Sequence, residues 1–377
     1  MEPQSFPLWL TLAHLPGLGP RGRVALLEHF GSIEALFRAS RAELKIAMAD
    51  NRFADTGRVD MPSAMTAVLG GPTDDAFASD VTWLREEQHH LVTWSDTDYP
   101  ALLRQIADPP MVLYVHGQRE LLARPQIAIV GSRNPTALGR QTASAFARTL
   151  TESGLTVTSG LALGIDAAAH RGALDANGET IAVCGTGLDR IYPARNRDLA
   201  HAVAERGALV SELPIGTPAR PGNFPVRNRI ISGLSLGVLV VEAALRSGSL
   251  ITARLAGEQG REVFALPGSI HSPLARGCHA LIRQGAKLVE TAADVLEELG
   301  AIAQVSTTTA SVAPPSPAGT LAPIERRLFD CVGYEPTSMD ALIERSGLTA
   351  ETVSSILLQL ELRGWVLMGP GGYQRAS

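Results

Sequence analysis

The sequence has few of the features that mark disulfide-rich, zinc-binding or strongly basic proteins. Its three cysteines, Cys184, Cys278 and Cys331, lie far apart, which excludes a disulfide framework and a CxxC zinc site. Lys45 and Lys287 are the only lysines, so the basic charge is almost all arginine. The net charge is -5, without the basic excess typical of nucleic-acid binders. Any nucleic-acid site must therefore be a local patch.

Long hydrophobic runs are also missing. No apolar segment approaches the roughly 20 residues that a membrane-spanning helix needs. The first residues, Met1-Glu2-Pro3, lack the positive region of a secretory signal peptide. These absences predict a soluble cytoplasmic protein with no membrane partner. What is present is a hydrophobic fraction of 45% over 377 residues, and domains of about 100–200 residues then predict two or three of them.

The first part of the chain, residues 1–80, is predicted to be a small helical domain of the SAM or helix-hairpin-helix kind. Leu18-Gly19-Pro20 interrupts one helical pattern, and a second runs from Arg23 to Phe30. The Pro16–Gly19 turn resembles a helix-hairpin-helix turn, whose backbone N–H groups hold phosphate. A plain connection between two helices explains the same residues. Residues 50–80 have weak periodicity and are predicted to be rich in loops.

Residues 81–302 alternate between short apolar runs and helical patterns. Strands are predicted at 126–130, 155–158, 180–184, 209–213, 237–241 and 262–266. Helices are predicted between them, for example at 166–174, 197–205 and 250–258. This alternation indicates an α/β fold, an extended Rossmann-like core with a doubly wound parallel sheet. Right-handed crossovers place helices on both of its faces.

The end of the chain shows a change of composition. Residues 303–320 are rich in Ser, Thr, Ala and Pro, and are predicted to form a flexible linker. Residues 321–377 then show helical patterns at 321–332, 338–345 and 349–363, followed by a wing at 365–373. This order predicts a winged helix.

Glycine and polar residues follow the ends of the predicted strands. In a doubly wound sheet these ends form the ligand site, and their free N–H groups suit a phosphate. Tight turns that merely need glycine are the alternative for any single loop. The candidate binding residues are Gly131, Ser132, Arg133, Ser159, Gly160, Gly185, Thr186, Ser247 and Gly248.

A second candidate is the segment from Arg220 to Arg229, which contains no acidic residue. Its arginines, Arg220, Arg227 and Arg229, suit a phosphate backbone, and Phe224 is suited to stack on a base. Asn223 and Asn228 complete the candidate set, with Asn228 expected to bond to backbone. The alternative is a structural arginine pair beside a core phenylalanine.

Three further features are candidates for catalysis, and structural roles could explain two of them. Asp166 and His170 lie four residues apart on one predicted helix face, as an acid/base pair or as groups that orient the helix. Glu242 is a candidate carboxylate for a nucleotide hydrolase. Tyr192 is expected to pack a loop. A strict GxGxxG after the first predicted core strand and a Walker A pattern are both absent from the sequence, so no cofactor is predicted, and no metal.

Taken in order, these motifs resemble the DNA-processing protein DprA (Smf) family. The resemblance is dense from about Trp94 to Val289. It is carried by Gly131-Ser-Arg133, Ser159-Gly-Leu-Ala-Leu-Gly-Ile-Asp166, Gly185-Thr-Gly-Leu-Asp189, Asn223-Phe-Pro-Val-Arg-Asn-Arg229, Ser247-Gly-Ser-Leu-Ile-Thr-Ala253 and Ala265-Leu-Pro-Gly268. One departure is Gly277-Cys278-His279, where the family usually has a small hydroxyl residue and Asn before the Leu-Ile pair.

The resemblance implies a non-catalytic protein that binds single-stranded DNA. It implies a homodimer that protects incoming DNA and loads the RecA recombinase on it during natural transformation and recombination. Arg133 and the segment 223–229 fall where the family grips the strand.

Two rival functions remain open. Nucleotide phosphoribohydrolases of the LOG type share the Rossmann-like core, but their Pro-Gly-Gly-x-Gly-Thr-x-x-Glu motif is replaced here by Glu242-Ala-Ala-Leu-Arg-Ser-Gly. A regulator that binds duplex DNA through the winged helix is the other. Residues 320–377 contain five Arg against seven acidic residues, which disfavours a duplex reader and fits a protein contact better.

Overall fold

The computed structural model describes residues 5–49, 60–72, 77–300, 323–333, 336–362, 365–369 and 372–375. The chain forms two compact units, Met1–Ser306 and Thr307–Ser377. The predicted linker, residues 303–320, lies outside the described residues.

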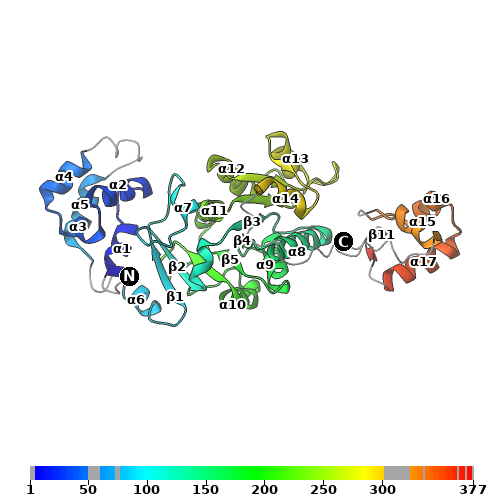
Figure 1. Ribbon diagram of the computed structural model, residues 1–377, viewed down its shortest axis with the longest axis horizontal. Coiled ribbons are helices and arrows are strands. Elements are labelled where there is room, and N and C mark those ends of the chain that lie inside the picture. Colours follow the sequence, from blue (N-terminus) through cyan, green and yellow to red (C-terminus); the bar gives the residue numbers. More distant parts are fainter. Residues whose placement is uncertain are drawn as a thin grey trace. The chain divides into compact units, whose positions relative to one another are not determined.

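Short helices form the N-terminal part of the first unit (Figure 1). They are α1 (Phe6–Ala13), α2 (Pro20–Phe30), α3 (Ile33–Arg38), α4 (Arg41–Met48), α5 (Met61–Gly70) and α6 (Ala78–Trp83). Local sequence sets their starts: Ser40 and Glu43 form a capping box at α4. The Pro16–Gly19 turn joins α1 to α2 as predicted, and the Gly17 carbonyl accepts a hydrogen bond from the Asp60 amide at 2.9 Å. Phosphate binding by this turn stays a prediction.

The core is a nine-stranded sheet in the order β1-β2-β6-β5-β4-β3-β7-β8-β9. The strands are β1 (His89–Thr93), β2 (Val112–Gly117), β3 (Gln126–Val130), β4 (Thr156–Ser159), β5 (Thr180–Val183), β6 (Ala208–Ser211), β7 (Gly237–Val240), β8 (Glu262–Ala265) and β9 (Lys287–Leu288). The strands β3 to β9 run parallel, and the fold class is confirmed. The order reverses at β3, whose neighbours are β4 and β7.

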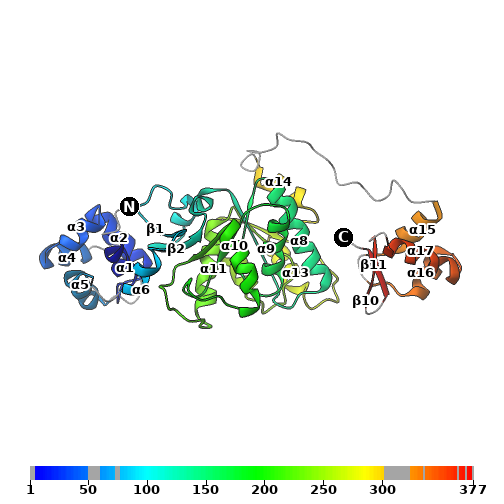
Figure 2. The same cartoon turned by 90° about the horizontal axis from the view of Figure 1, so that it is seen from below.

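Helices cover both faces of this sheet (Figure 2). Ile127 and Ile129 of β3 face α8 (Ala137–Glu152), α9 (Ile165–Asp175) and α14 (Ala292–Leu299) in one apolar cluster. Ala128 and Val130 belong to the opposite cluster, with α7 (Ala101–Arg104), α11 (Asn223–Leu234), α12 (Ser249–Glu258) and α13 (Arg276–Arg283). Because helices cover both faces of the sheet, all of β3 is buried and Ile127 to Val130 are apolar. Helix α10 (Arg197–Arg206) packs into the cluster that the N-terminal helices share.

Two features of the core were not predicted. Strands β1 and β2 pair antiparallel at one edge, and β2 is also antiparallel to β6, so the sheet is mixed rather than purely parallel. The arginine-rich segment from residue 223 is helix α11 rather than an open strand-binding segment. Tertiary packing decides both, because apolar residues of β2 and α11 have interior partners that local patterns do not reveal.

The second unit is a winged helix. Helices α15 (Pro323–Cys331), α16 (Met339–Ser346) and α17 (Ala350–Leu362) precede the antiparallel wing of β10 (Val366–Gly369) and β11 (Gly372–Arg375). Leu328, Leu342 and Leu357 lie in its apolar core. Ser338 caps α16, and Gly347 ends it in the left-handed conformation. The predicted winged fold is confirmed.

Candidate nucleic-acid interface

A pocket of about 600 Å³ opens where the strand order reverses. Loops that follow β3 and β7 form two of its walls, and the start of α11 forms another. Ligands of doubly wound sheets bind at this type of position, outside the carboxyl ends of the strands. The lining includes Gly131, Ser132, Arg133, Ala162, Asp166, Tyr192, Pro221, Phe224, Arg227, Asn228, Arg246, Ser247, Gly248 and Thr252.

Glu242 holds the loop that carries Arg133. Its carboxylate accepts hydrogen bonds from the Thr136 amide (2.9 Å) and from the Thr136 hydroxyl (2.7 Å), and its main-chain carbonyl accepts one from the Ser132 amide (2.6 Å). Gly139 leaves room for this carboxylate, because a Cβ there would lie 2.4 Å from the Glu242 Cδ. Both carboxylate oxygens are thus committed to the start of α8. This arrangement suits a structural cap rather than the catalytic base of a hydrolase.

An exposed arginine and two aromatic rings meet at the mouth of the pocket. The Arg133 guanidinium lies 6.0 Å from the centre of the Phe224 ring, and the Tyr192 and Phe224 ring centres are 5.3 Å apart. Tyr192 is 53% exposed, so the expectation that it only packs a loop is incomplete. A cation beside aromatic faces suits a polymer with alternating phosphates and bases.

Arg227 lies beneath the pocket instead of projecting from it. Its side chain is 7% exposed and donates hydrogen bonds to the carbonyls of Gly160 (2.7 Å) and Val183. Burial raises the pKa of the neighbouring Asp166, whose carboxylate accepts the Gly160 and Ala162 amides. The prediction that Arg227 forms an open basic patch is therefore corrected, because the side chain is buried and its Nη1 donates to two protein carbonyls.

Arg229 is buried in a second network and is corrected in the same way. It is 5% exposed and forms a bidentate pair with Glu212 at 2.6 and 2.7 Å, and its Nε lies 3.1 Å from Asp108. The absence of acids between residues 212 and 242 suggested a free cation. Its partners are Glu212, at the start of that acid-free interval, and Asp108, from a distant segment. The alternative of a structural arginine pair describes both residues.

Four other predicted binding residues shape the interior of the site. The Ser159 hydroxyl donates to the Ile129 carbonyl, and the Thr186 hydroxyl donates to the Arg190 carbonyl. A Cβ at Gly160 would lie 2.6 Å from Arg227 Nη1, and one at Gly185 would lie 2.8 Å from the Phe224 ring. These contacts explain why small residues stand there. The hydroxyls of Ser159 and Thr186 are bonded within the protein, and strand binding through the N–H groups of these loops stays a prediction.

The remaining predicted residues lie nearer the surface. Asn228 Nδ2 lies 3.4 Å from the Gly248 carbonyl, so the expected bond to backbone is confirmed, and Asn223 Nδ2 reaches the Gly185 carbonyl at 3.1 Å. The Ser247 hydroxyl pairs with that of Ser249 at the start of α12. Arg220 is exposed on the loop before α11.

Sequence reasoning missed Arg246, which lines the pocket from the loop after β7. Its position shortly after the predicted strand at 237–241 could have indicated Arg246 as a site residue. Arg133, Arg220 and Arg246 are all exposed, and no ion pair joins any of them to another described residue. We call these three arginines, together with Tyr192 and Phe224, the rim.

His170 does not pair with Asp166. Its Nδ1 lies 2.7 Å from the Thr180 hydroxyl, which itself donates to the Val157 carbonyl, so Nδ1 carries the proton. Burial lowers the pKa of His170 to about 3, and the ring is neutral. The acid/base pair is therefore wrong, and the helix-orienting hydrogen bond is confirmed.

The divergent Gly277-Cys278-His279 segment belongs to α13, with Gly277 and Cys278 buried and His279 half-buried. The Cys278 thiol is buried against the carbonyls of Val240 and Val241, and burial raises its pKa to about 11. His279 Nε2 lies 3.0 Å from the Gly268 carbonyl. In the described part of the chain, potential metal-ligating side chains do not gather in groups of three. No helix among the same residues is long and apolar enough to cross a bilayer.

The fold and the pocket define a Rossmann-like protein with a cationic, aromatic rim at the switch point of its sheet. The family model described as DNA recombination-mediator protein A matches residues 90–300, and the model for the DprA winged helix domain matches residues 312–372. The chain belongs to the DNA recombination-mediator protein A (DprA, Smf) family.

Relatives support this membership over most of the chain. Protein Smf of Escherichia coli (strain K12) is 47% identical over 300 residues, covering 79% of this chain and 80% of the relative. The X-ray structure of DprA from Streptococcus pneumoniae matches with a TM-score of 0.66 and 36% identity, over 78% of this chain and 97% of that one. DprA from Helicobacter pylori, whose structure is described for its single-stranded DNA binding mode, matches with a TM-score of 0.51 and 32% identity, over 56% and 95%.

Proposed function

We propose that the chain binds single-stranded DNA at the rim and catalyses no reaction. The observation that carries this proposal is a switch-point pocket lined by Arg133, Arg246, Tyr192 and Phe224, with exposed Arg220 preceding the lining residue Pro221. These three arginines are exposed and form no ion pair with another described residue. Guanidinium groups bind phosphate oxygens, and aromatic rings stack on unpaired bases. The single-stranded DNA binding named for the Helicobacter pylori relative supports the same ligand.

Strand binding is the first step of a role in recombination. The chain acts in the cytoplasm as a homodimer that protects incoming DNA and loads RecA on it in natural transformation and recombination. Membership of a recombination-mediator family supports this role. Two copies on one strand raise the effective concentration of the second site, so a dimer binds long strands more tightly than short ones. The matching test is the rate of RecA filament formation on a single-stranded oligonucleotide, with and without this protein.

The binding proposal is tested by fluorescence anisotropy of the full chain with single- and double-stranded oligonucleotides of equal length, over a salt series. We expect a clear preference for single strands that weakens as salt rises. Equal or stronger binding of duplex would instead support a regulator that acts through the winged helix. Absence of binding to both would overturn the proposal.

The enzyme alternative has its own test. Incubation with nucleoside 5′-monophosphates and chromatography for free base would detect a phosphoribohydrolase. We expect no base release, because both Glu242 carboxylate oxygens are bound by Thr136. Release that is lost in Glu242→Gln would favour the hydrolase.

A further inference from the structure

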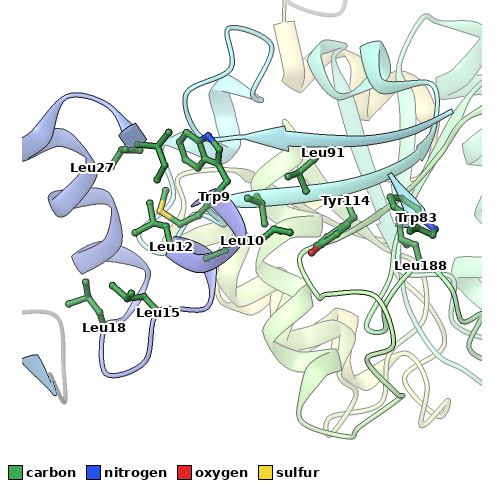
Figure 3. Packing of buried hydrophobic residues seen from close by; sticks show 14 of the residues in the cluster. Trp9, Leu10, Leu12, Leu15, Leu18, Leu27, Trp83, Leu91, Tyr114 and Leu188 are labelled. Atoms are coloured by element: carbon green, nitrogen blue, oxygen red, sulfur yellow. The ribbon is translucent and has the colours of Figure 1, made fainter. Parts of the chain in front are cut away.

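The N-terminal helices share one hydrophobic cluster with two loops of the candidate site. The cluster joins Leu10 of α1 and Trp83 of α6 to Leu188, in the loop after β5, and Ile215, in the loop after β6, packs against it. Figure 3 shows Leu10, Trp83, Tyr114 and Leu188 within this cluster. The loop after β5 continues to Tyr192 of the rim. The N-terminal helices therefore form part of the support for these loops.

A buried carboxylate adds a polar link at the same place. Asp80 of α6 is 4% exposed, and its Oδ1 accepts hydrogen bonds from the Tyr114 hydroxyl (2.7 Å) and from the Ile215 amide (2.9 Å). Burial and the nearby Asp80 raise the pKa of Tyr114, which keeps this hydroxyl a donor. Asp80 thus ties an N-terminal helix to the main chain of a site loop.

The loop that Asp80 holds, residues 212–222, leads to the rim. It contains Arg220 and runs into α11, which carries Phe224. Besides the Arg229–Glu212 pair, further anchors include the Gly216 amide, which donates to Asp189 Oδ1 at 2.8 Å, and the Thr217 carbonyl, which accepts the Gly187 amide at 3.0 Å. The position of Ile215 therefore constrains where Arg220 lies relative to the pocket.

We propose that Asp80 is a positioning residue for strand binding, through which the N-terminal helices hold the 212–222 loop in its binding conformation. The inference rests on the proposed function. If the loop adopts its binding conformation only part of the time, the apparent DNA affinity is the intrinsic affinity multiplied by the populated fraction of that conformation. Asp80 itself lies too deep to touch DNA, so its effect reaches the strand only through the loop.

The test compares Asp80→Ala with Tyr114→Phe in the full chain. Asp80→Ala removes the acceptor for Ile215, and we expect faster hydrogen exchange across residues 213–217. We expect oligo-dT affinity to fall about three- to tenfold, the factor that corresponds to one buried hydrogen bond. Tyr114→Phe removes a donor to the same oxygen but leaves the Ile215 bond, so its affinity should stay within about twofold of wild type. Asp80→Asn keeps an acceptor and should restore most of the affinity.

The salt dependence separates positioning from direct contact. Asp80→Ala should keep the wild-type slope of log affinity against log salt, whereas Arg220→Ala should lower that slope, because it removes a phosphate contact. If Asp80→Ala does not fold, Asp189→Ala removes the partly exposed anchor at Gly216 and should also weaken binding.

Two results would overturn the inference. One is an oligo-dT affinity that equals that of a binding wild type in a folded Asp80→Ala or Asp189→Ala protein. The other is weakened binding with unchanged exchange across the loop. Failure of the wild type to bind oligo-dT would instead overturn the proposed function, so the two failures are distinguishable.

Discussion

Two groups of arginines near the candidate site have different surroundings. Arg227 and Arg229 are buried in α11 and bonded to carbonyls or carboxylates of the protein. Arg133, Arg220 and Arg246 are exposed; Arg133 and Arg246 line the pocket, and Arg220 precedes the lining residue Pro221. Arg227 lies near buried Asp166 and His170, and Arg229 pairs with Glu212 and Asp108. We call Arg227, Arg229, Asp166 and His170 the buried layer, and the exposed arginines belong to the rim. Charged residues in a sequence therefore identify candidate binding side chains, and their burial in the fold decides which of these side chains can contact a ligand.

This comparison assigns different consequences to similar substitutions. Removing a buried charge leaves its partners unsatisfied and lowers the free energy of unfolding. Removing an exposed charge has little effect on folding and should alter only what binds there. Substitutions in the buried layer and in the rim test this division.

The largest effect is expected for Arg229→Ala. The substitution leaves Glu212 and Asp108 without their partner, and we expect the free energy of unfolding to fall by about 3 kcal/mol. Urea denaturation would measure it. Arg220→Ala is the matched control, with an expected change within about 0.5 kcal/mol. Similar stability losses for both variants would contradict the division between layer and rim.

The buried layer should also make the protein sensitive to acid. The pKa of His170 is lowered to about 3 in the folded chain, so between about pH 6.5 and 3 the unfolded chain binds a proton that the folded chain does not. Stability due to this group is fully present above pH 6.5 and falls as the pH drops. At pH 5 the loss should be about 2 kcal/mol relative to pH 7.

The measurement is the free energy of unfolding at both pH values for wild type and His170→Gln. The variant lacks the titrating ring and should lose less stability on acidification. Identical pH dependence in the two proteins would show that the buried ring is not responsible.

Phe224→Ala should act on binding. If the ring stacks on a base, its loss should cost about 1–2 kcal/mol of binding free energy without changing the salt dependence. Fluorescence of 2-aminopurine within a single-stranded oligonucleotide reports the stacking. Val226→Ala is the control, since Val226 is exposed on the same helix without a ring. Equal quenching by Phe224→Ala and wild type would remove Phe224 from the binding surface.

The smallest effect, but the most specific, is expected for Arg133→Ala. Loss of one phosphate contact should reduce the slope of log affinity against log salt by about 0.7 for a single strand. Thermal unfolding should match the wild type. An unchanged slope would mean that this guanidinium does not contact the phosphate backbone.

Much of the fold could be predicted from sequence, because its periodic signals are strong. The apolar runs at 126–130 and 237–241 became adjacent parallel strands, and the helical pattern at 166–174 became α9. The winged helix was predicted from the helical patterns at 321–332, 338–345 and 349–363 and the wing at 365–373, and the structure shows α15, α16, α17 and the β10–β11 wing. These elements depend on local chemistry, which the sequence contains in full.

The candidate site was harder to predict, because burial depends on distant parts of the chain. Arg229 is paired with Asp108, more than a hundred residues away, and Nη1 of Arg227 donates to carbonyls at the ends of β4 and β5. Tyr192 was assigned to loop packing, although its ring stands exposed beside Phe224. The antiparallel edge was missed for the same reason, since β2 pairs with β6 from far along the chain.

The central claim is that the rim contacts single-stranded DNA. The most direct test is ultraviolet crosslinking of the full chain to an oligonucleotide that contains 5-iodouracil, followed by mass spectrometry of the adducts. The account predicts adducts on peptides that contain Tyr192 or Phe224, and their loss in Phe224→Ala and Tyr192→Ala. Adducts confined to residues 323–375, with none at the pocket, would contradict it.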